Sequence, residues 1–145
     1  MSKRFLVAFL LALLLPAAAD VAGETRFRPY ALVVDPAGEP LAAWQVELTY
    51  DAAAVRIVGV EGGREPWQEA PYYDAKGLDA GRMLVASFTL VASPPAGAMV
   101  VARIHAQETI GSGTSIRAKL TAAADPDGRR IGATVRLVPE KGVRP

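Results

Sequence analysis

The chain has 145 residues, of which 51% are hydrophobic and 21% charged, and it contains no cysteine. This composition is typical of one globular domain, because it is too apolar for a disordered chain and too mixed for a polytopic membrane protein. The lack of cysteine excludes a disulfide scaffold, a thiolate metal site and a cysteine nucleophile. Thirteen glycines and eleven prolines without a triplet period exclude collagen and indicate many turns.

The N-terminus has the pattern of a secretory signal peptide. A basic start precedes an unbroken apolar run at residues 5–15, and the alanines at 17–19 supply small residues for cleavage. We therefore predict a signal peptide over residues 1–19, cut before Asp20, and a secreted or periplasmic protein. The run of 11 residues is shorter than the roughly 20 that span a bilayer. An uncleaved anchor is the alternative.

Cleavage would leave a chain of nearly balanced charge. Without Lys3 and Arg4, 14 basic residues stand against 15 acidic ones. No block of lysine and arginine is present, so we expect no nucleic-acid partner. No second apolar stretch reaches membrane-spanning length, so we expect no membrane span in the mature chain. The sequence does not indicate an oligomeric state.

From residue 30 onward the hydrophobic period is two, which predicts strands with one buried face. In the clearest strand, the side chains predicted to face the core are Trp44, Val46, Leu48 and Tyr50. Four later runs alternate in the same way, with core-facing sets at Leu84, Ala86, Phe88 and Leu90; at Val100, Ala102, Ile104 and Ala106; at Ile116, Ala118 and Leu120; and at Ile131, Ala133, Val135 and Leu137. Two runs, at 30–34 and 55–60, are apolar on both faces, which predicts central strands.

Turn signals separate these runs. The sequences Asp-Pro-Ala-Gly at 35–38 and Asp-Pro-Asp-Gly at 125–128 predict type I turns, and we expect hairpins there. About seven short strands with this punctuation predict an all-β fold, a single antiparallel β-sandwich. The long connection at 62–81, with one helical turn expected near 74–78, would either cover an open end of the core or carry function.

Two adjacent segments resemble a cohesin signature. Residues 42–51, AAWQVELTYD, are similar to an amphipathic strand ending in Tyr-Asp, and residues 55–63, VRIVGVEGG, are similar to the Val-rich strand that follows it. The resemblance covers about residues 30–138. It implies a jelly-roll sandwich from a superfamily that also contains carbohydrate-binding modules, and a non-catalytic module that binds a protein. In cohesins the sheet with the Tyr-Asp strand binds dockerin; Ala43 and Gln45 occupy the matching outward positions here.

These observations predict four segments: a signal peptide (1–19), an N-terminal extension (20–28), a cohesin-like β-sandwich (29–139) and a polar C-terminal tail (140–145). We expect an exported recognition module of the cell envelope or medium, not an enzyme, with a protein as its partner. The side chains predicted to face that partner from one sheet are Gln45, Glu47, Met83, Val85, Arg117 and Lys119. A solvated sheet face is the alternative, and a reversed register would place Met83 and Val85 in the core.

Three aromatic residues in the long connection, Trp67, Tyr72 and Tyr73, have three interpretations. They would plug the open end of the sandwich, anchor a protein partner, or stack against sugar rings and make the chain a carbohydrate-binding module.

Catalytic and metal-binding patterns are weak. His105 is the only histidine and no nucleophile motif accompanies it, so a small hydrolase is the least supported class. Asp125 and Asp127 resemble the start of a calcium loop, but no glutamate closes it. We favour a turn there and leave a weak calcium site open. No cofactor is predicted.

Overall fold

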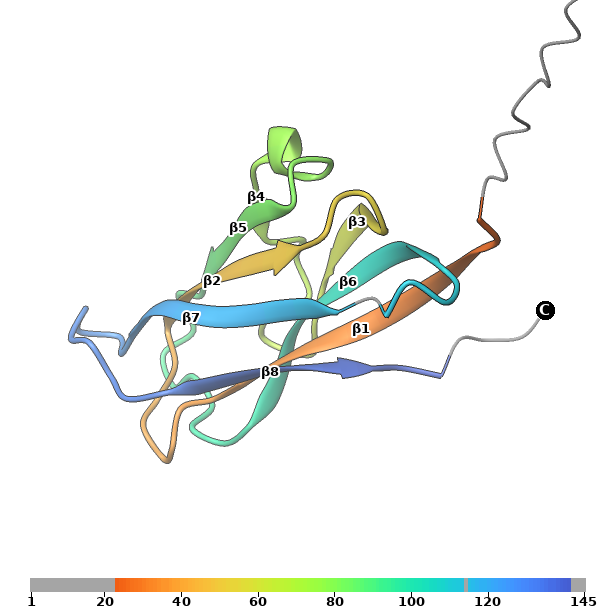
Figure 1. Cartoon of the computed structure of the whole chain (residues 1–145). Helices are drawn as coiled ribbons and strands as arrows, with labels where there is room; N and C mark the ends of the chain where they lie inside the picture. The colour runs from red at the N-terminus through yellow and green to blue at the C-terminus, as the bar shows by residue number, and fades with distance from the viewer. Residues whose placement is uncertain (1–22, 114, 142–145) are drawn as a thin grey trace, which may run out of the picture.

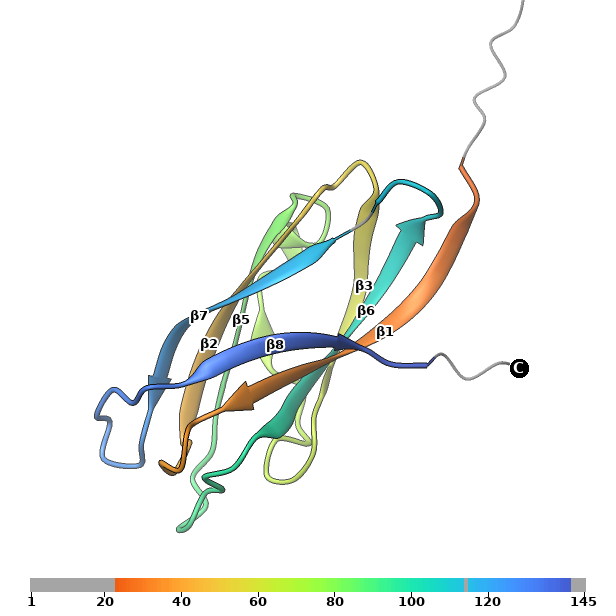
Figure 2. The same cartoon turned by 60° about the horizontal axis from the view of Figure 1, so that its bottom comes forward.

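The computed structural model describes residues 23–113 and 115–141, so the predicted signal peptide lies outside the described residues. These residues form two antiparallel four-stranded sheets that face one another (Figures 1 and 2). The β1 sheet has the order β3 (Val55–Gly62), β6 (Met99–Thr109), β1 (Thr25–Asp35), β8 (Thr134–Pro139). The β2 sheet has the order β4 (Tyr72–Tyr73), β5 (Arg82–Phe88), β2 (Ala43–Tyr50), β7 (Ile116–Ala124). The predicted all-β antiparallel sandwich is confirmed.

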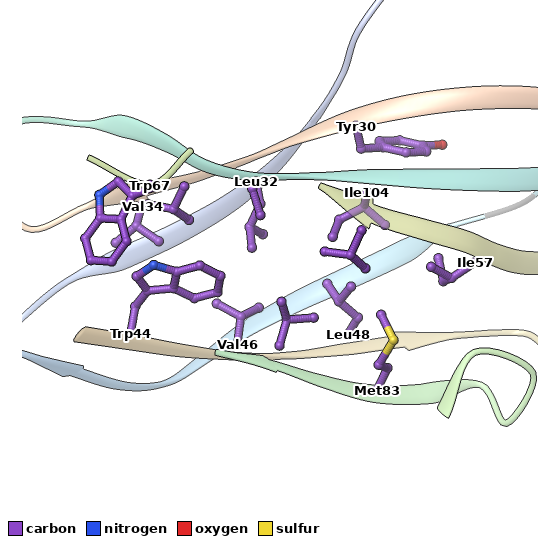
Figure 3. Packing of buried hydrophobic residues seen from close by; sticks show 14 of the residues in the cluster. Tyr30, Leu32, Val34, Trp44, Val46, Leu48, Ile57, Trp67, Met83 and Ile104 are labelled. Atoms are coloured by element: carbon purple, nitrogen blue, oxygen red, sulfur yellow. The ribbon is translucent and has the colours of Figure 1, made fainter. Parts of the chain in front are cut away.

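The core lies between the two sheets and follows the predicted alternation of β2. Trp44, Val46 and Leu48 are all buried and point towards the β1 sheet (Figure 3). They meet Leu32 and Ile104, which are fully buried on β1 and β6. The predicted inward sets of β7 and β8 also pack against this core. Within the described residues no helix has the length and apolarity to cross a membrane.

The prediction for β5 is wrong by one residue in register. Met83 and Val85, expected on the outward face, are 1% and 0% exposed and belong to the core; Figure 3 shows Met83 beside Leu48 between the sheets. Leu84, Phe88 and Leu90, expected inside, are exposed at 36%, 71% and 89%.

Pairing with β2 explains this outcome. Directly opposite residues of neighbouring strands share a face of the sheet. Val85 lies opposite Val46, and Leu84 lies opposite Glu47. Since β2 has a single apolar face, it forces Val85 inward and leaves Leu84 outward.

Both Asp-Pro turns are present, but only the second matches the prediction: the Gly128 N–H donates to the Asp125 carbonyl, and Ala124 pairs with Arg130 across the turn as a short hairpin. In the first turn Ala37 and Gly38 both have positive φ, so it is not type I, and it joins no hairpin. The first carries the chain from β1 in one sheet to β2 in the other, and the second carries it from β7 to β8 in the same manner. Each turn is stabilised by its leading aspartate: Asp35 accepts the backbone N–H of Ala37, and Asp125 accepts those of Asp127 and Arg129. The run at 30–34 is central in its sheet as predicted, whereas β3 is an edge strand.

The Tyr-Asp end of β2 fixes two connections. The hydroxyl of Tyr50 donates to the carbonyl oxygens of Gly77 (2.6 Å) and Leu78 (2.9 Å), at the predicted helical turn η1 (Ala75–Gly77). Its burial raises the pKa of the phenol. Asp51 accepts the N–H of Ala53 at 2.9 Å and so shapes the turn into β3.

The long connection closes one end of the core with Trp67, which is 2% exposed. Its indole N–H points to the sulfur of Met99 at 3.2 Å, and its ring packs edge-to-face on Trp44 with centroids 6.3 Å apart. Gly62 and Gly63 make this closure feasible, because a Cβ at either position would collide with the backbone of residues 68 or 100. Trp67 therefore plugs the sandwich end.

A buried carboxylate lies at the opposite end of the sandwich. Glu108 of β6 is 1% exposed, accepts a hydrogen bond from the Tyr30 hydroxyl, and pairs with Arg26 (3.1 Å) and Arg28 (3.9 Å). Burial raises the pKa of Tyr30, and the hydrogen bond to Glu108 raises it further. The carboxylate is stabilised by these three partners together.

We predict that Glu108→Ala lowers the free energy of unfolding by about 2 to 3 kcal/mol, because Tyr30 loses its buried acceptor while both arginines can still reach water. The control is Glu140→Ala, whose pair with Arg103 at 3.3 Å is one-third exposed on both sides and contributes about 1 kcal/mol or less. Urea denaturation measures both. Equal losses would show that the Glu108 cluster contributes no more to the free energy of unfolding than the exposed Glu140–Arg103 pair.

Candidate functional site

The outward surface of the β2 sheet has two chemically different ends. Near the start of β2, the residues across the sheet are small or aromatic apart from one glutamine. Phe88, Ala43 and Ala124 form one row, and Tyr72, Ala86, Gln45 and Ala122 form the next. Near the end of β2 the rows carry charge: Leu84, Glu47 and Lys119, then Arg82, Thr49 and Arg117. We call these rows together the outer face of the β2 sheet.

The apolar end of this face contains a groove of about 320 Å³. Four alanines, at 43, 86, 122 and 124, line its floor, and the rings of Tyr72 and Phe88 border it. Both rings are largely exposed, at 73% and 71%. Gln45 lies at its edge and is held by a hydrogen bond to Thr121 (3.0 Å), the extra residue of a β-bulge in β7. The groove has the shape and chemistry to accept one large apolar side chain.

The charged end holds three cations and one carboxylate. Arg82 Nε donates to Glu47 Oε2 at 2.9 Å, which uses the only acidic group of these rows. Arg117 and Lys119 are exposed, and within the described residues neither side chain makes a hydrogen bond or an ion pair. This end therefore has excess positive charge close to the apolar groove.

The structure brings together four of the six residues predicted to face a partner. Gln45 and Glu47 of β2 lie on the outer face beside Arg117 and Lys119 of β7. Met83 and Val85 do not belong to this face, because they are in the core. Sequence reasoning missed Phe88, Leu84 and the alanines at 86, 122 and 124. The signal for β5 was that it is apolar on both faces, so that one face had to remain exposed.

The three aromatic residues of the long connection do not form a common exposed platform. Trp67 is buried, whereas Tyr72 faces outward and its neighbour Tyr73 is half-buried. Consecutive strand residues point to opposite sides, which separates the two tyrosines. Because Trp67 is buried, it is not available to stack against a sugar ring, and the carbohydrate interpretation loses its tryptophan.

His105 lies away from this site, on the β1 sheet. Its Nε2 is 3.1 Å from Glu61 Oε2, at an angle that does not make a hydrogen bond. Its directly opposite neighbours are Pro29 and Gly59, which supply no nucleophile. Asp125 and Asp127 make contacts within the turn. Asp125 Oδ1 accepts the backbone N–H of Asp127, and Asp127 Oδ2 pairs with Arg129 at 2.7 Å. No cluster of three or more metal-ligand side chains occurs in residues 23–113 and 115–141.

Comparison with solved structures identifies the architecture as cohesin-like. A structure of the CaDoc0917–CaCohA2 complex matches 76% of this chain and 83% of its own, with a TM-score of 0.59 and 11% identity. A type I cohesin–dockerin complex from Clostridium thermocellum, Coh-OlpA–Doc918, matches 76% of this chain and 82% of its own, with a TM-score of 0.56 and 15% identity.

The seventh ScaB type I cohesin from Pseudobacteroides cellulosolvens matches 85% of this chain and 86% of its own, with a TM-score of 0.55 and 12% identity. No family model matches the sequence, and no curated protein matches it. The chain thus has a divergent cohesin-like fold, in agreement with the resemblance seen in residues 42–63.

We predict that Val85→Asp lowers the free energy of unfolding by at least about 4 kcal/mol, because it buries an unpaired carboxylate in the core. Phe88→Asp, three residues along the same strand, should change it by about 1 kcal/mol or less, because that ring is exposed. Thermal and urea unfolding of the two variants measures the difference. A stable Val85→Asp protein would refute the observed register of β5.

Proposed function

We propose that this chain is a non-catalytic, exported protein-recognition module that binds its partner through the outer face of the β2 sheet. The observation that carries the proposal is the apolar groove between Tyr72 and Phe88, with the exposed cations of Arg117 and Lys119 on the same face. Exposed aromatic rings beside a small-residue floor are typical of interface centres, and flanking charges set specificity and association rate.

The fold supports the same proposal by analogy. Two of the matched structures are complexes that contain a cohesin and a dockerin. At 11% and 15% identity these matches establish the fold, and the site must be argued from this chain's own residues. Export is supported by the signal-peptide pattern at residues 1–19.

Exposed apolar surface also distinguishes this region from an ordinary solvated sheet. Phe88, Leu90 and Tyr72 expose most of their side chains within one region of the molecule. Contact of large apolar side chains with water is unfavourable, and the free energy falls when a partner covers them. Burial of these side chains is therefore the expected driving force for binding.

Site-specific photo-cross-linking tests the proposal. A photoreactive residue replaces Ala86 on the outer face of the β2 sheet or, as a control, the exposed Arg136 of β8 in the other sheet. The mature protein is then incubated with exported proteins of its source. We expect a discrete adduct from position 86 that disappears when Phe88→Asp is added, a change that should leave the fold intact.

An adduct that forms equally from both positions, or that survives Phe88→Asp, would contradict the assignment of the binding face. As a matched control, Phe27→Asp removes a ring of similar exposure on the β1 sheet and should not affect the adduct.

A further inference from the structure

The β7 strand forms one edge of the β2 sheet, and this edge offers an interaction surface of its own. We infer that the open edge of β7 binds an extended segment of another protein, which pairs with it as an antiparallel strand and in which acidic residues alternate with apolar ones. The inference goes beyond the proposed function, because it concerns a second surface and depends on backbone pairing instead of the groove beside Phe88.

Alternation along the strands shows which backbone groups of β7 point to the open edge. The Tyr50 N–H donates to a carbonyl on the β5 side, so the backbone groups of the preceding Thr49 point the other way, to β7. Thr49 lies opposite Arg117, and two residues further along the same ladder Lys119 has the same orientation. The backbone groups of these two residues are therefore used within the sheet. Those that point to the open edge belong to Ile116, Ala118 and Leu120.

The chain itself already pairs with another part of this edge. After the Asp-Pro turn, the Ile131 N–H donates to the Ala123 carbonyl at 3.0 Å, on the side of β7 away from β2. The chain then leaves for β8 in the other sheet. Among the described residues, no backbone group pairs with the edge at 116–120. An incoming segment would continue the line of the existing pairing over about 16 Å.

The core is incompletely covered on the same side of the sandwich. The inward side chains of β7 at 116–120 are only partly buried, whereas Val46 and Leu48 of the neighbouring β2 are fully buried. β8 lies beside β7 on this side (Figures 1 and 2), and its inward Val135 and Leu137 are also partly buried. Apolar side chains of an added strand would cover these residues, and their burial would favour binding.

Two cations on the outward side of the edge determine the charge of the partner. Arg117 and Lys119 are exposed, and neither side chain is paired within the part of the chain that the structure describes. Because their backbone groups point to β2, an added antiparallel strand would meet them in non-hydrogen-bonded pairs, in which facing side chains are closest. Opposite charges stabilise such pairs and like charges destabilise them. We therefore expect acidic residues at the two facing positions of the partner, two residues apart.

The same cations disfavour a second copy of the chain at this edge. Two β7 strands that paired edge to edge in antiparallel orientation would bring Arg117 and Lys119 of one copy against the cations of the other. Charged residues, lysine above all, commonly protect edge strands against self-association in this way. The charge of the edge thus favours an acidic strand over a copy of β7.

Amide hydrogen exchange in the presence of designed peptides tests the inference. The probe is an eight-residue peptide of alternating glutamate and valine. One control peptide has lysine in place of glutamate, and another has the composition of the probe with the glutamates and valines in two blocks. In the mature protein alone, we expect fast exchange of the N–H groups of Ile116, Ala118 and Leu120 and slow exchange of those of Arg117 and Lys119.

A saturating concentration of the alternating peptide should slow exchange at the three edge amides by about tenfold or more, because they become hydrogen-bonded to the added strand. The two control peptides should have little effect at the same concentration. Nuclear magnetic resonance resolves the individual amides.

Affinities of variants provide the second readout. Arg117→Glu/Lys119→Glu should weaken binding of the glutamate peptide by about tenfold and strengthen binding of the lysine peptide by a similar factor. Ala118→Pro should also weaken binding by about tenfold, because it removes an edge donor that β2 does not use. The control is Arg136→Glu on the exposed side of β8, which changes net charge away from this edge and should leave affinity unchanged.

The outcomes distinguish the edge from other sites. Equal protection by all three peptides, or no protection at the edge amides, would overturn the inference. A peptide whose binding is lost with Phe88→Asp would lie on the outer face of the β2 sheet, which overturns the edge site and leaves the proposed function in place. A concentration-dependent dimer in analytical ultracentrifugation that Ala118→Pro abolishes would assign the edge to a second copy of the chain and would also overturn the inference.

Discussion

The pairing of β2 with its two neighbours is the constraint on which the rest of this structure depends. β2 has one apolar and one polar face, so its orientation is fixed by the hydrophobic effect alone. β5 and β7 then take their orientation from β2 through direct opposition of residues. This transfer of orientation buries Met83 and Val85 and leaves Phe88 and the alanines on the surface. The core and the candidate site are therefore two results of one register.

The sandwich could be predicted from sequence wherever a strand had a single apolar face. β2 and β7 alternate cleanly, and their inward residues were identified correctly. The orientation of β5 could not be predicted in this way, because four successive residues, Met83 to Ala86, are apolar. Local periodicity then does not indicate which face of the strand is buried. The buried face of β5 is decided by pairing with its neighbouring strand, and which strand is the neighbour depends on the sheet order. The turns were found because Asp, Pro and Gly act locally, whereas whether a turn stays within a sheet depends on distant contacts.

The candidate site was predicted in its charged half, but only in part in its apolar half, where Gln45 and Tyr72 were identified and Phe88 was missed. Where polar residues such as Glu47 and Lys119 alternate with core residues, the sequence pattern predicts that they face outward. Alanines do not, since they are compatible with core and surface alike. Phe88 was assigned to the core because it alternates with Leu84 and Ala86, and a large ring normally gains from burial. Its exposure is an exception to that rule, and for this reason it is the most informative single residue on the face.

The short β4 strand leaves β5 protected along only part of its length. β4 pairs with Val85 and Ala86, while the N–H of Thr89 is held by the carbonyl of Ala42 on the β2 side. Because successive strand amides point to opposite edges, the N–H of Phe88 points away from β2, past the end of β4. Amide protons along this strand consequently differ in access to solvent: those of Ser87 and Thr89 are shielded, and that of Phe88 between them can exchange with deuterium unless another molecule lies over it.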